Sequence, residues 1–320
     1  MKIIRDLKDL AEPLKNSVAT IGNFDGVHLG HREIFRGIVK KAHATGGKSV
    51  VITFVPHPLK VLAPEQAPRL LNTYIEKERL IRASCVYYLV ELTFDEEMAA
   101  MSPDDFVENI LINKLGVQHL IVGYDYAFGR DRAGDVDFLS RKGKEKGFTV
   151  EVLGPILRGE EIFSSTLARR LLGAGAVVGV VEPLGRNFTL EGRVVKGASR
   201  GAKLGFPTAN LLTEKEILPR PGVYAVKVKY EDRLYDGVMN IGFNPTFGAE
   251  RISLEVNLLD FAQEIYGKTL RVYFVERIRD EKVFRSGDEL AGQIAEDVDT
   301  ARQVLSGAKI IEYRDYLDCG

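Results

Sequence analysis

The chain has 320 residues, and its 44 basic and 45 acidic residues give a formal net charge of -1 at pH 7. This balance excludes the excess positive field of a non-specific nucleic-acid binder, and the longest small and apolar run, "LLGAGAVVGVV", is too short to span a bilayer. We therefore expect neither a nucleic-acid nor a membrane partner. A chain of this length with 45% hydrophobic residues is expected to form two domains, each with its own core.

The chain start and the cysteine usage indicate a compartment. The first residues, "MKIIRDLKDLAEPLK", are charged throughout and lack the apolar centre of a signal peptide. Cys85 and Cys319 are the only cysteines, and their wide separation without metal-ligand spacing favours free thiols over a disulfide scaffold. We therefore expect a cytoplasmic protein.

In the first half of the chain, β-branched runs alternate with segments whose apolar residues recur at spacings of three and four. This alternation predicts an α/β domain with a parallel sheet. One predicted helix carries its own start signal, because Ser102 suits the N-cap and Pro103 the first helical position. The runs that we interpret as strands are "SVATIG", "KSVVITF", "VYYLVEL", "QHLIVG" and "FTVEVL".

The stretch "TIGNFDGVHLGHREIF" follows the first of these strands and places His28 and His31 three residues apart at a predicted helix start. Residues three apart share one helical face, and this edge of an open α/β sheet is where ligands bind. Gly26 and Gly30 remove side chains where a phosphate chain would pass, and a helix N-terminus favours an anion. We expect an anion site here and not a zinc site, because no third ligand lies nearby in the sequence.

A second anion-binding segment is predicted in "IFSSTLARRLL". Ser164, Ser165 and Thr166 stand at a helix start, and Arg169 follows Thr166 by one turn on the same face. The same pattern also suits an ordinary N-cap with an exposed arginine. Between the two segments, the loop "GYDYAFGRDRAGD" follows a predicted strand and carries aromatic, glycine and charged residues on which a ring could stack.

From about residue 185 the pattern changes to alternating strands separated by turns. These strands predict a β-barrel or β-sandwich, closed by a helix in "SGDELAGQIAEDVDTARQVL" for which Ser286 and Glu289 form a capping box. We place the boundary so that the domains are residues 1–184 and 185–320. Four apolar residues are expected on one face of the terminal helix. They are Leu290, Ile294, Val298 and Leu305.

Polar residues in this second half suggest a metal and a base. Pro207 pushes its neighbour into an extended conformation, so that Thr208 and Asn210 share one face and offer two neutral oxygen ligands suited to Mg²⁺. Upstream glycines at 192, 197, 201 and 205 suit a mobile flap. In "SLEVNLLD", alternation puts Glu255 on the face opposite Leu254 and Val256, where it is either a solvated strand residue or a catalytic one.

The motifs "GNFDGVHLGH", "FVPHP", "GYDYAFGRDRAGD" and "SSTLAR" occur in the order found in the bacterial bifunctional riboflavin kinase/FAD synthetase family, which the chain resembles over nearly its whole length. The second half resembles the kinase module of that family through "GRVVKGASRGAKLGFPTANL", "GVYAVKV", "GVMNIGFNPTFG", "LEVNLLDFAQEIYG" and "RDEKVF". The resemblance implies an N-terminal Rossmann-like nucleotidyltransferase domain and a C-terminal antiparallel barrel of the riboflavin kinase type. The chain departs from the family at Val55, where an acid is usual, and His57 is expected to be structural.

The resemblance also implies two reactions. ATP would phosphorylate riboflavin to FMN in the barrel, and ATP would adenylylate FMN to FAD in the N-terminal domain with release of pyrophosphate. Mg²⁺ would be the cofactor, ATP the co-substrate, and flavins the substrates and products. An alternative is a single-activity nucleotidyltransferase with a flavin-sensing barrel, which would not need Thr208, Asn210 and Glu255. The sequence leaves the oligomeric state open.

Roles for single residues follow from the same resemblance. His28 and His31 would stabilise charge in the transition state of adenylyl transfer, Arg169 would hold the leaving phosphates, and Glu255 would be the general base of the kinase. Thr208 and Asn210 would hold Mg²⁺. The residues implied in nucleotide, flavin or phosphate binding are Asn23, Asp25, Gly30, Asp125, Phe128, Ser165, Thr166, Gly205, Thr208 and Asn210.

Overall fold

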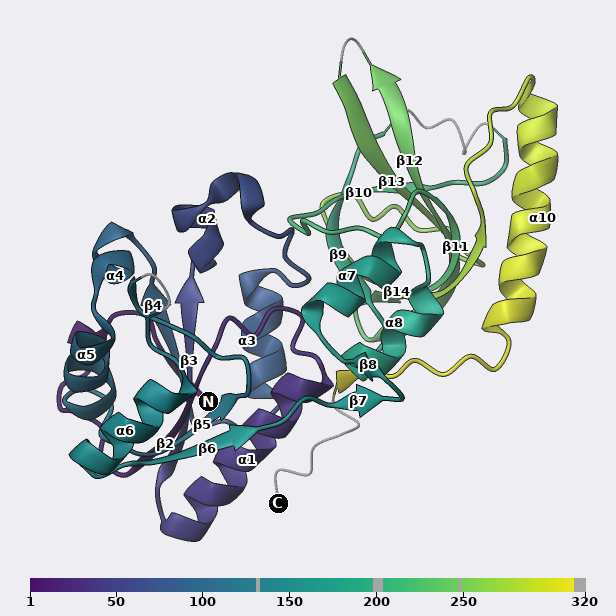
Figure 1. The fold of residues 1–320 in the computed structure, drawn as a ribbon. Helices are drawn as coiled ribbons and strands as arrows, with labels where there is room; N and C mark the ends of the chain where they lie inside the picture. The colour runs from purple at the N-terminus through teal and green to yellow at the C-terminus, as the bar shows by residue number, and fades with distance from the viewer. Residues whose placement is uncertain (131–132, 198–203, 247–248, 314–320) are drawn as a thin grey trace. The chain divides into compact units, whose positions relative to one another are not determined.

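The structure is a computed structural model that describes residues 1–130, 133–197, 204–246 and 249–313 (Figure 1). Within the loop from 244 to 251 it describes the backbone only, again without 247–248. The described chain divides into two compact units, Met1–Ser165 with Tyr313, and Thr166–Glu312.

The first unit is built on a six-stranded parallel sheet in the order β1-β4-β3-β2-β5-β6. The five strands predicted from the sequence are present. The edge strand β1 was missed, because three residues are too few for a periodic pattern. The strands are β1 (Lys2–Ile4), β2 (Ser17–Ile21), β3 (Lys48–Val55), β4 (Tyr88–Thr93), β5 (Val117–Gly123) and β6 (Thr149–Leu153).

Helices cover both faces of this sheet (Figure 1). Val51 packs with residues of α1 (Leu29–Thr45) and α3 (Tyr74–Arg82), whereas its neighbours Val50 and Ile52 pack with residues of η3 (Phe106–Ile112) and α6 (Val136–Lys146). This alternation is why the strands are apolar on both sides. The smaller elements are η1 (Leu7–Asp9), α2 (Pro58–Leu62), η2 (Pro64–Gln66), α4 (Glu96–Ala100), α5 (Pro103–Asp105), β7 (Leu157–Arg158) and β8 (Glu161–Ile162). The predicted start signal is confirmed, since Ser102 caps α5 by accepting from the Asp105 N–H.

The second unit is a closed antiparallel barrel in the order β10-β13-β12-β11-β14-β9, which decides between barrel and sandwich. Tyr224, Met239 and Phe274 are fully buried on its inner face. Residues of the opposite face, Val223 and Ala225 among them, pack against the terminal helix α10 (Gly287–Leu305). The strands are β9 (Thr189–Val195), β10 (Ala209–Leu212), β11 (Gly222–Tyr230), β12 (Arg233–Thr246), β13 (Ala249–Leu258) and β14 (Thr269–Arg279).

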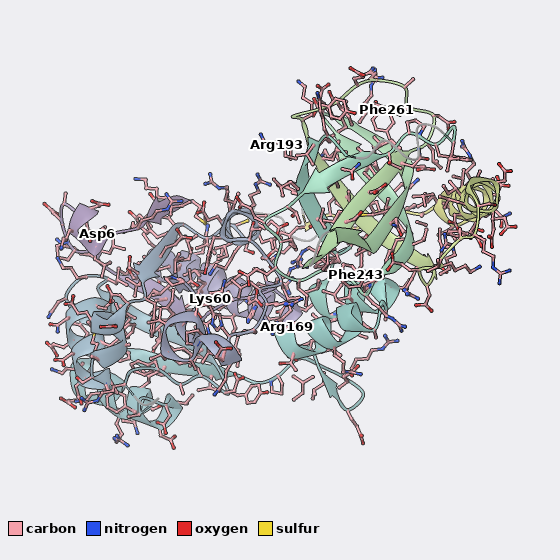
Figure 2. The ribbon with its side chains drawn as sticks, turned by 90° about the horizontal axis from the view of Figure 1, so that it is seen from above. Asp6, Lys60, Arg169, Arg193, Phe243 and Phe261 are labelled. Carbon is pink, nitrogen blue, oxygen red and sulfur yellow. The ribbon has the colours of Figure 1, made fainter. Side chains whose placement is uncertain are left out.

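Helices α7 (Ser165–Gly173) and α8 (Val177–Leu184) precede the barrel. The capping box predicted for α10 is half formed. Ser286 accepts from the Glu289 N–H at 3.2 Å, but the Glu289 carboxylate accepts from the Arg285 N–H and not from that of Ser286. Phe261, which follows β13 and is labelled in Figure 2, packs edge-on against Tyr230 and Tyr235.

Two further observations bear on the sequence expectations. In the part of the chain that the structure describes, no helix is both long enough and apolar enough to cross a bilayer. The expectation of a free thiol at Cys85 is wrong, because Cys85 is disulfide-bonded; Cys319 lies outside the described residues. Residues that are far apart in the chain meet here: the hydroxyl of Tyr313, near the C-terminus, lies 2.5 Å from that of Ser84, the neighbour of Cys85.

Candidate active sites

The first site is the turn that joins β2 to α1. Three of its residues have φ in the left-handed region: Phe24 at 49°, Gly26 at 78° and Val27 at 41°. Non-glycine residues rarely adopt this conformation, and each one costs about 1–3 kcal/mol unless the surrounding structure holds it. Strain of this kind is typical of functional turns, and it persists only where contacts with the surrounding structure hold the turn.

Asp25 and Ser165 supply such contacts. The buried Asp25 carboxylate accepts from the backbone N–H of Leu71 at 2.9 Å and from that of Asn72 at 3.4 Å. The Ser165 hydroxyl donates to the Asp25 carbonyl oxygen at 2.8 Å. Two residues that the resemblance implies in binding therefore also fasten the turn to neighbouring segments.

The two histidines lie together at the start of α1. His28 is the N-cap and His31 lies in the first turn; their rings stack with centroids 3.6 Å apart, and Phe24 packs edge-on against His31 at 5.2 Å. Gly30 makes this stack possible, because a Cβ there would lie 3.0 Å from Cε1 of His28. The glycine thus has a packing reason that the sequence did not indicate. Ring N–H groups and the helix N-terminus together favour a negatively charged ligand.

A small cavity borders the same turn. It is lined by Asn23, Asp25, Asn72, Tyr74 and Lys77 among others, and sequence reasoning missed the last three. A lysine in "TYIEKERLIR" has the pattern of a solvated helix face, so nothing in the sequence distinguished it. His57 also lines the cavity, and its Nδ1 accepts from the Leu59 N–H at 3.2 Å to cap α2, which is the structural contact we expected of it.

The loop after β5 carries two further predicted site residues, Asp125 and Phe128. Asp125 is exposed in it. The Phe128 ring is only 6% exposed and packs against Phe106 and Phe138 in the core on the opposite face of the sheet from Phe24. The structure therefore does not bring the Phe128 ring to the histidine stack, and its part in enclosing a ligand stays a prediction.

Thr166 and Arg169 lie in α7, within the second compact unit. Figure 2 labels Arg169. Thr166 is exposed and Arg169 is half-buried. The helix has the spacing of one turn between them that the sequence predicted. Their role toward phosphates bound at the histidines stays a prediction.

The second site lies on the outer face of the barrel around Glu255. Its carboxylate accepts from the Thr208 hydroxyl at 3.3 Å and from the Ser253 hydroxyl at 3.2 Å. Asn210 on β10 and Asn240 on β12 are its direct neighbours in the sheet register. The structure thus brings Thr208, Asn210 and Glu255 together, although 47 residues separate Thr208 from Glu255 in the chain.

In the segment before β10, the backbone packs closely against neighbouring residues. The Asn257 amide donates to the Pro207 carbonyl at 2.6 Å and fixes the "GFPTAN" segment on β13. Gly197 lies against the Asn210 amide so closely that a Cβ would collide with it, and Gly205 has a left-handed φ of 87°. The predicted flap glycine at 201 lies outside the described residues. A hydroxyl, an amide oxygen and a carboxylate form a hard oxygen donor set, which fits Mg²⁺.

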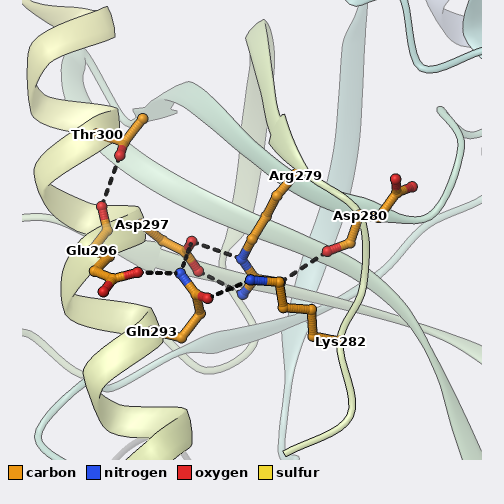
Figure 3. A network of polar contacts seen from close by, with 7 residues as sticks. All are labelled: Arg279, Asp280, Lys282, Gln293, Glu296, Asp297 and Thr300. Atoms are coloured by element: carbon orange, nitrogen blue, oxygen red, sulfur yellow. Dashed lines mark hydrogen bonds and ion pairs between the residues drawn. The ribbon is translucent and has the colours of Figure 1, made fainter.

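A polar network holds the connection from β14 to α10 near this face (Figure 3). Arg279 makes two bonds of 2.7 Å to the buried Asp297 carboxylate, and Gln293 bonds both Lys282 and Glu296. A groove beside the network is lined by Lys282, Phe284, Glu289 and Gln293 among others. The network keeps α10 on the barrel and shapes this groove.

Comparisons with known proteins match both halves of the chain. Residues 10–167 match the sequence model "FAD synthetase", and residues 184–305 match the model "Riboflavin kinase". The bifunctional riboflavin kinase/FMN adenylyltransferase of Escherichia coli (strain K12) is 38% identical over 311 residues, 97% of this chain and 99% of that protein. The protein of the same name from Pseudomonas fluorescens is 39% identical over 307 residues, 96% of this chain and 98% of that protein.

One solved structure is similar to this chain over nearly the full length of both proteins. It is titled "Crystal Structure of Macrolide-efflux Protein from Streptococcus pneumoniae", with a TM-score of 0.85 and 33% identity, covering 94% of this chain and 98% of that one. Its title describes that protein, whereas the two matched models and the relatives named above assign a family over both units of this chain. The chain belongs to the bifunctional riboflavin kinase/FMN adenylyltransferase family.

Proposed function

We propose that this chain phosphorylates riboflavin to FMN at the Glu255 site and adenylylates FMN to FAD at the histidine turn, with ATP as the co-substrate of both reactions. The observation that carries the proposal is that one chain matches both a FAD synthetase and a riboflavin kinase model, each over a site with suitable chemistry.

In the kinase reaction, the terminal ribityl hydroxyl of riboflavin attacks the γ-phosphorus of ATP. A new O–P bond forms, the bond from the γ-phosphorus to the ADP oxygen breaks, and the Glu255 carboxylate takes the hydroxyl proton. The hydroxyls of Thr208 and Ser253 hold this carboxylate in place. Thr208 and Asn210 would hold Mg²⁺, which when bound neutralises phosphate charge. Gly205, at its left-handed position, would let the backbone approach the nucleotide.

In the adenylyltransferase reaction, a phosphate oxygen of FMN attacks the α-phosphorus of ATP and pyrophosphate leaves. His28 and His31 donate ring N–H groups toward the charge that develops on the α-phosphate, and the N-terminus of α1 adds its partial positive charge. Arg169 and Thr166 would hold the leaving pyrophosphate. Asn23, Asp25, Gly30 and Ser165 would form the wall of this site around the turn. The loop after β5 would help to enclose the ligand through Asp125, with the buried Phe128 ring anchoring that loop in the core.

The test is to incubate the purified protein with riboflavin, ATP and Mg²⁺ and to separate the flavins over time. We expect FMN to appear first and FAD to follow, and FMN supplied directly to become FAD without a lag. A chain that converts FMN to FAD but leaves riboflavin untouched would instead have a flavin-sensing barrel without kinase activity. EDTA should stop both reactions, which checks the requirement for a divalent cation.

A further inference from the structure

A triangle of hydrogen bonds holds the strained turn from the side of α3. The Lys77 ammonium donates to the Asn23 carbonyl oxygen at 3.3 Å and to the Thr53 hydroxyl at 3.0 Å. The Thr53 hydroxyl in turn donates to the same Asn23 carbonyl at 3.4 Å. The carbonyl immediately before the left-handed Phe24 is therefore fixed by two side chains, one from α3 and one from β3.

Lys77 is buried where a charged group is costly. Its side chain is 5% exposed, and lysines are almost never that buried unless they are paired. The charged groups that face it are Glu91 on β4, Asp25 in the turn and Glu78 on α3. Arg5 bonds Glu91 at 3.2 Å, and the Tyr74 ring lies 5.3 Å from the ammonium.

These neighbours do not fully compensate for the burial. Desolvation lowers the pKa of Lys77 to about 8, against the opposing effect of the three carboxylates. Replacement of a buried charge by an apolar side chain of similar volume is often neutral or stabilising, so fold stability alone gives no reason for a lysine here. What the lysine supplies is a pair of directed bonds to the turn.

The helix that carries Lys77 is also held in place. The start of α3 is set by a capping box between Thr73 and Glu76, and the segment before it is held by Asp25 through the Leu71 N–H. The helix and the turn thus form one hydrogen-bonded assembly. A shift of the Asn23 carbonyl would release Phe24, whose ring packs against His31.

We propose that Lys77 and Thr53 are positioning residues for adenylyl transfer: their shared grip on the Asn23 carbonyl keeps the turn in the strained form that stacks His28 on His31. This inference rests on the proposed function of the histidine turn. Neither residue needs to touch a substrate, because both act through the turn.

The test compares Lys77→Met with Arg82→Met, a matched change at an exposed position of the same helix, in the full-length protein. FMN adenylylation and riboflavin phosphorylation are both measured. We expect Lys77→Met to lower kcat for FAD formation about tenfold or more, since small displacements of catalytic groups have effects of up to about a hundredfold. Riboflavin kinase activity should stay at the wild-type level, the melting temperature should not fall below that of the wild type, and Arg82→Met should change nothing.

Two further readouts separate positioning from general packing. Thr53→Val should show the same selective loss and Thr53→Ser should restore most of the activity, since serine keeps the hydroxyl. The ratio of wild-type to Lys77→Met adenylylation rates should fall as the pH rises through about 8, because the charge-assisted bonds of Lys77 weaken when it loses its proton. The ratio cancels the titration of substrates and of other groups.

The outcomes are distinct. If the wild-type protein forms no FAD, the proposed function fails. If it forms FAD and Lys77→Met does so within threefold of its rate, the positioning role is overturned. A Lys77→Met protein that loses both activities together or melts at a lower temperature would show a structural role instead, and so would a rate ratio that does not change with pH.

Discussion

His28 and His31 can act as a unit because their rings share one stack at the start of α1. Replacement of either by alanine removes a donor that we propose acts on the α-phosphate, and it leaves the other ring without its stacking partner. We expect FAD formation from FMN to fall by about a hundredfold or more in each variant, the scale of a lost oxyanion donor. Flavin chromatography should show undiminished FMN formation from riboflavin. Loss of both activities in a folded variant would contradict the separation of the two sites.

Glu255 allows a sharper distinction at the scale of one atom. Glu255→Gln keeps the size of the side chain and one of the two oxygens that accept from Thr208 and Ser253, but it removes the proposed base. A positioned general base is worth about a hundred- to ten-thousandfold in rate, whereas a solvated strand residue changes stability by less than about 0.5 kcal/mol and rate not at all. We expect the kinase rate to fall by that factor, the melting temperature to hold, and added FMN still to become FAD. A near-normal kinase rate would exclude Glu255 as the base.

The buried Lys77 also predicts how stability depends on pH. Its folded-state pKa of about 8 lies below the ordinary 10.5, so both states are protonated below pH 8 and the buried charge there has its full cost. Between pH 8 and 10.5 the folded state loses the proton first, and stability rises with pH by roughly 3 kcal/mol from this group. Urea unfolding at several pH values should show the advantage of Lys77→Met over the wild type shrinking across this range. A constant difference would mean that Lys77 titrates normally.

At the scale of helices and strands, the sequence predicts an element correctly where its own apolar pattern agrees with its tertiary contacts. The strands of the first sheet were predictable because both of their faces are apolar, but closure of the barrel was not, since it depends on β9 pairing with both β10 and β14. Motifs predicted the histidine pair and Glu255 as site residues, and the structure stacks the two rings and places Glu255 beside Thr208. Lys77 was missed because burial of a helix lysine is decided by the strands and turn that pack on it, not by its own neighbours in the chain.

In the terminal helix α10, the apolar pattern alone did not identify every buried residue. The apolar pattern placed Leu290, Ile294, Val298 and Leu305 on one face, and that face includes the buried Asp297, whose charge an arginine from β14 neutralises. Asp297→Ala would leave the half-buried Arg279 guanidinium without its carboxylate, so we expect a loss of about 1.5–3 kcal/mol in barrel stability, measured by urea unfolding. The control Asp299→Ala, at an exposed position of the same helix outside this network, should change stability by less than about 0.5 kcal/mol. Equal effects of the two changes would mean that the Arg279–Asp297 pair does not anchor α10.

At the scale of the whole molecule, the two families matched on one chain predict separable activities, and the packing of α7 and α8 decides where to cut. Leu172, Val180 and Leu184 of these helices are buried and belong to the second unit, and the Arg220 N–H donates to the Leu172 carbonyl at 2.9 Å. A fragment of residues 166–320 retains them, whereas one of residues 185–320, which begins at the predicted domain boundary, lacks them.

We expect both fragments to form FMN and no FAD, because Glu255, Thr208 and Asn210 are present in each and the histidines in neither. The shorter fragment should melt at a lower temperature, since each buried leucine or valine that loses its place removes about 1.5–3 kcal/mol of burial. Calorimetry together with the riboflavin kinase assay at a temperature below both transitions separates stability from catalysis. Equal melting temperatures would mean that α7 and α8 contribute nothing to the kinase module, and a folded 166–320 fragment without kinase activity would mean that the barrel site needs residues from the first unit.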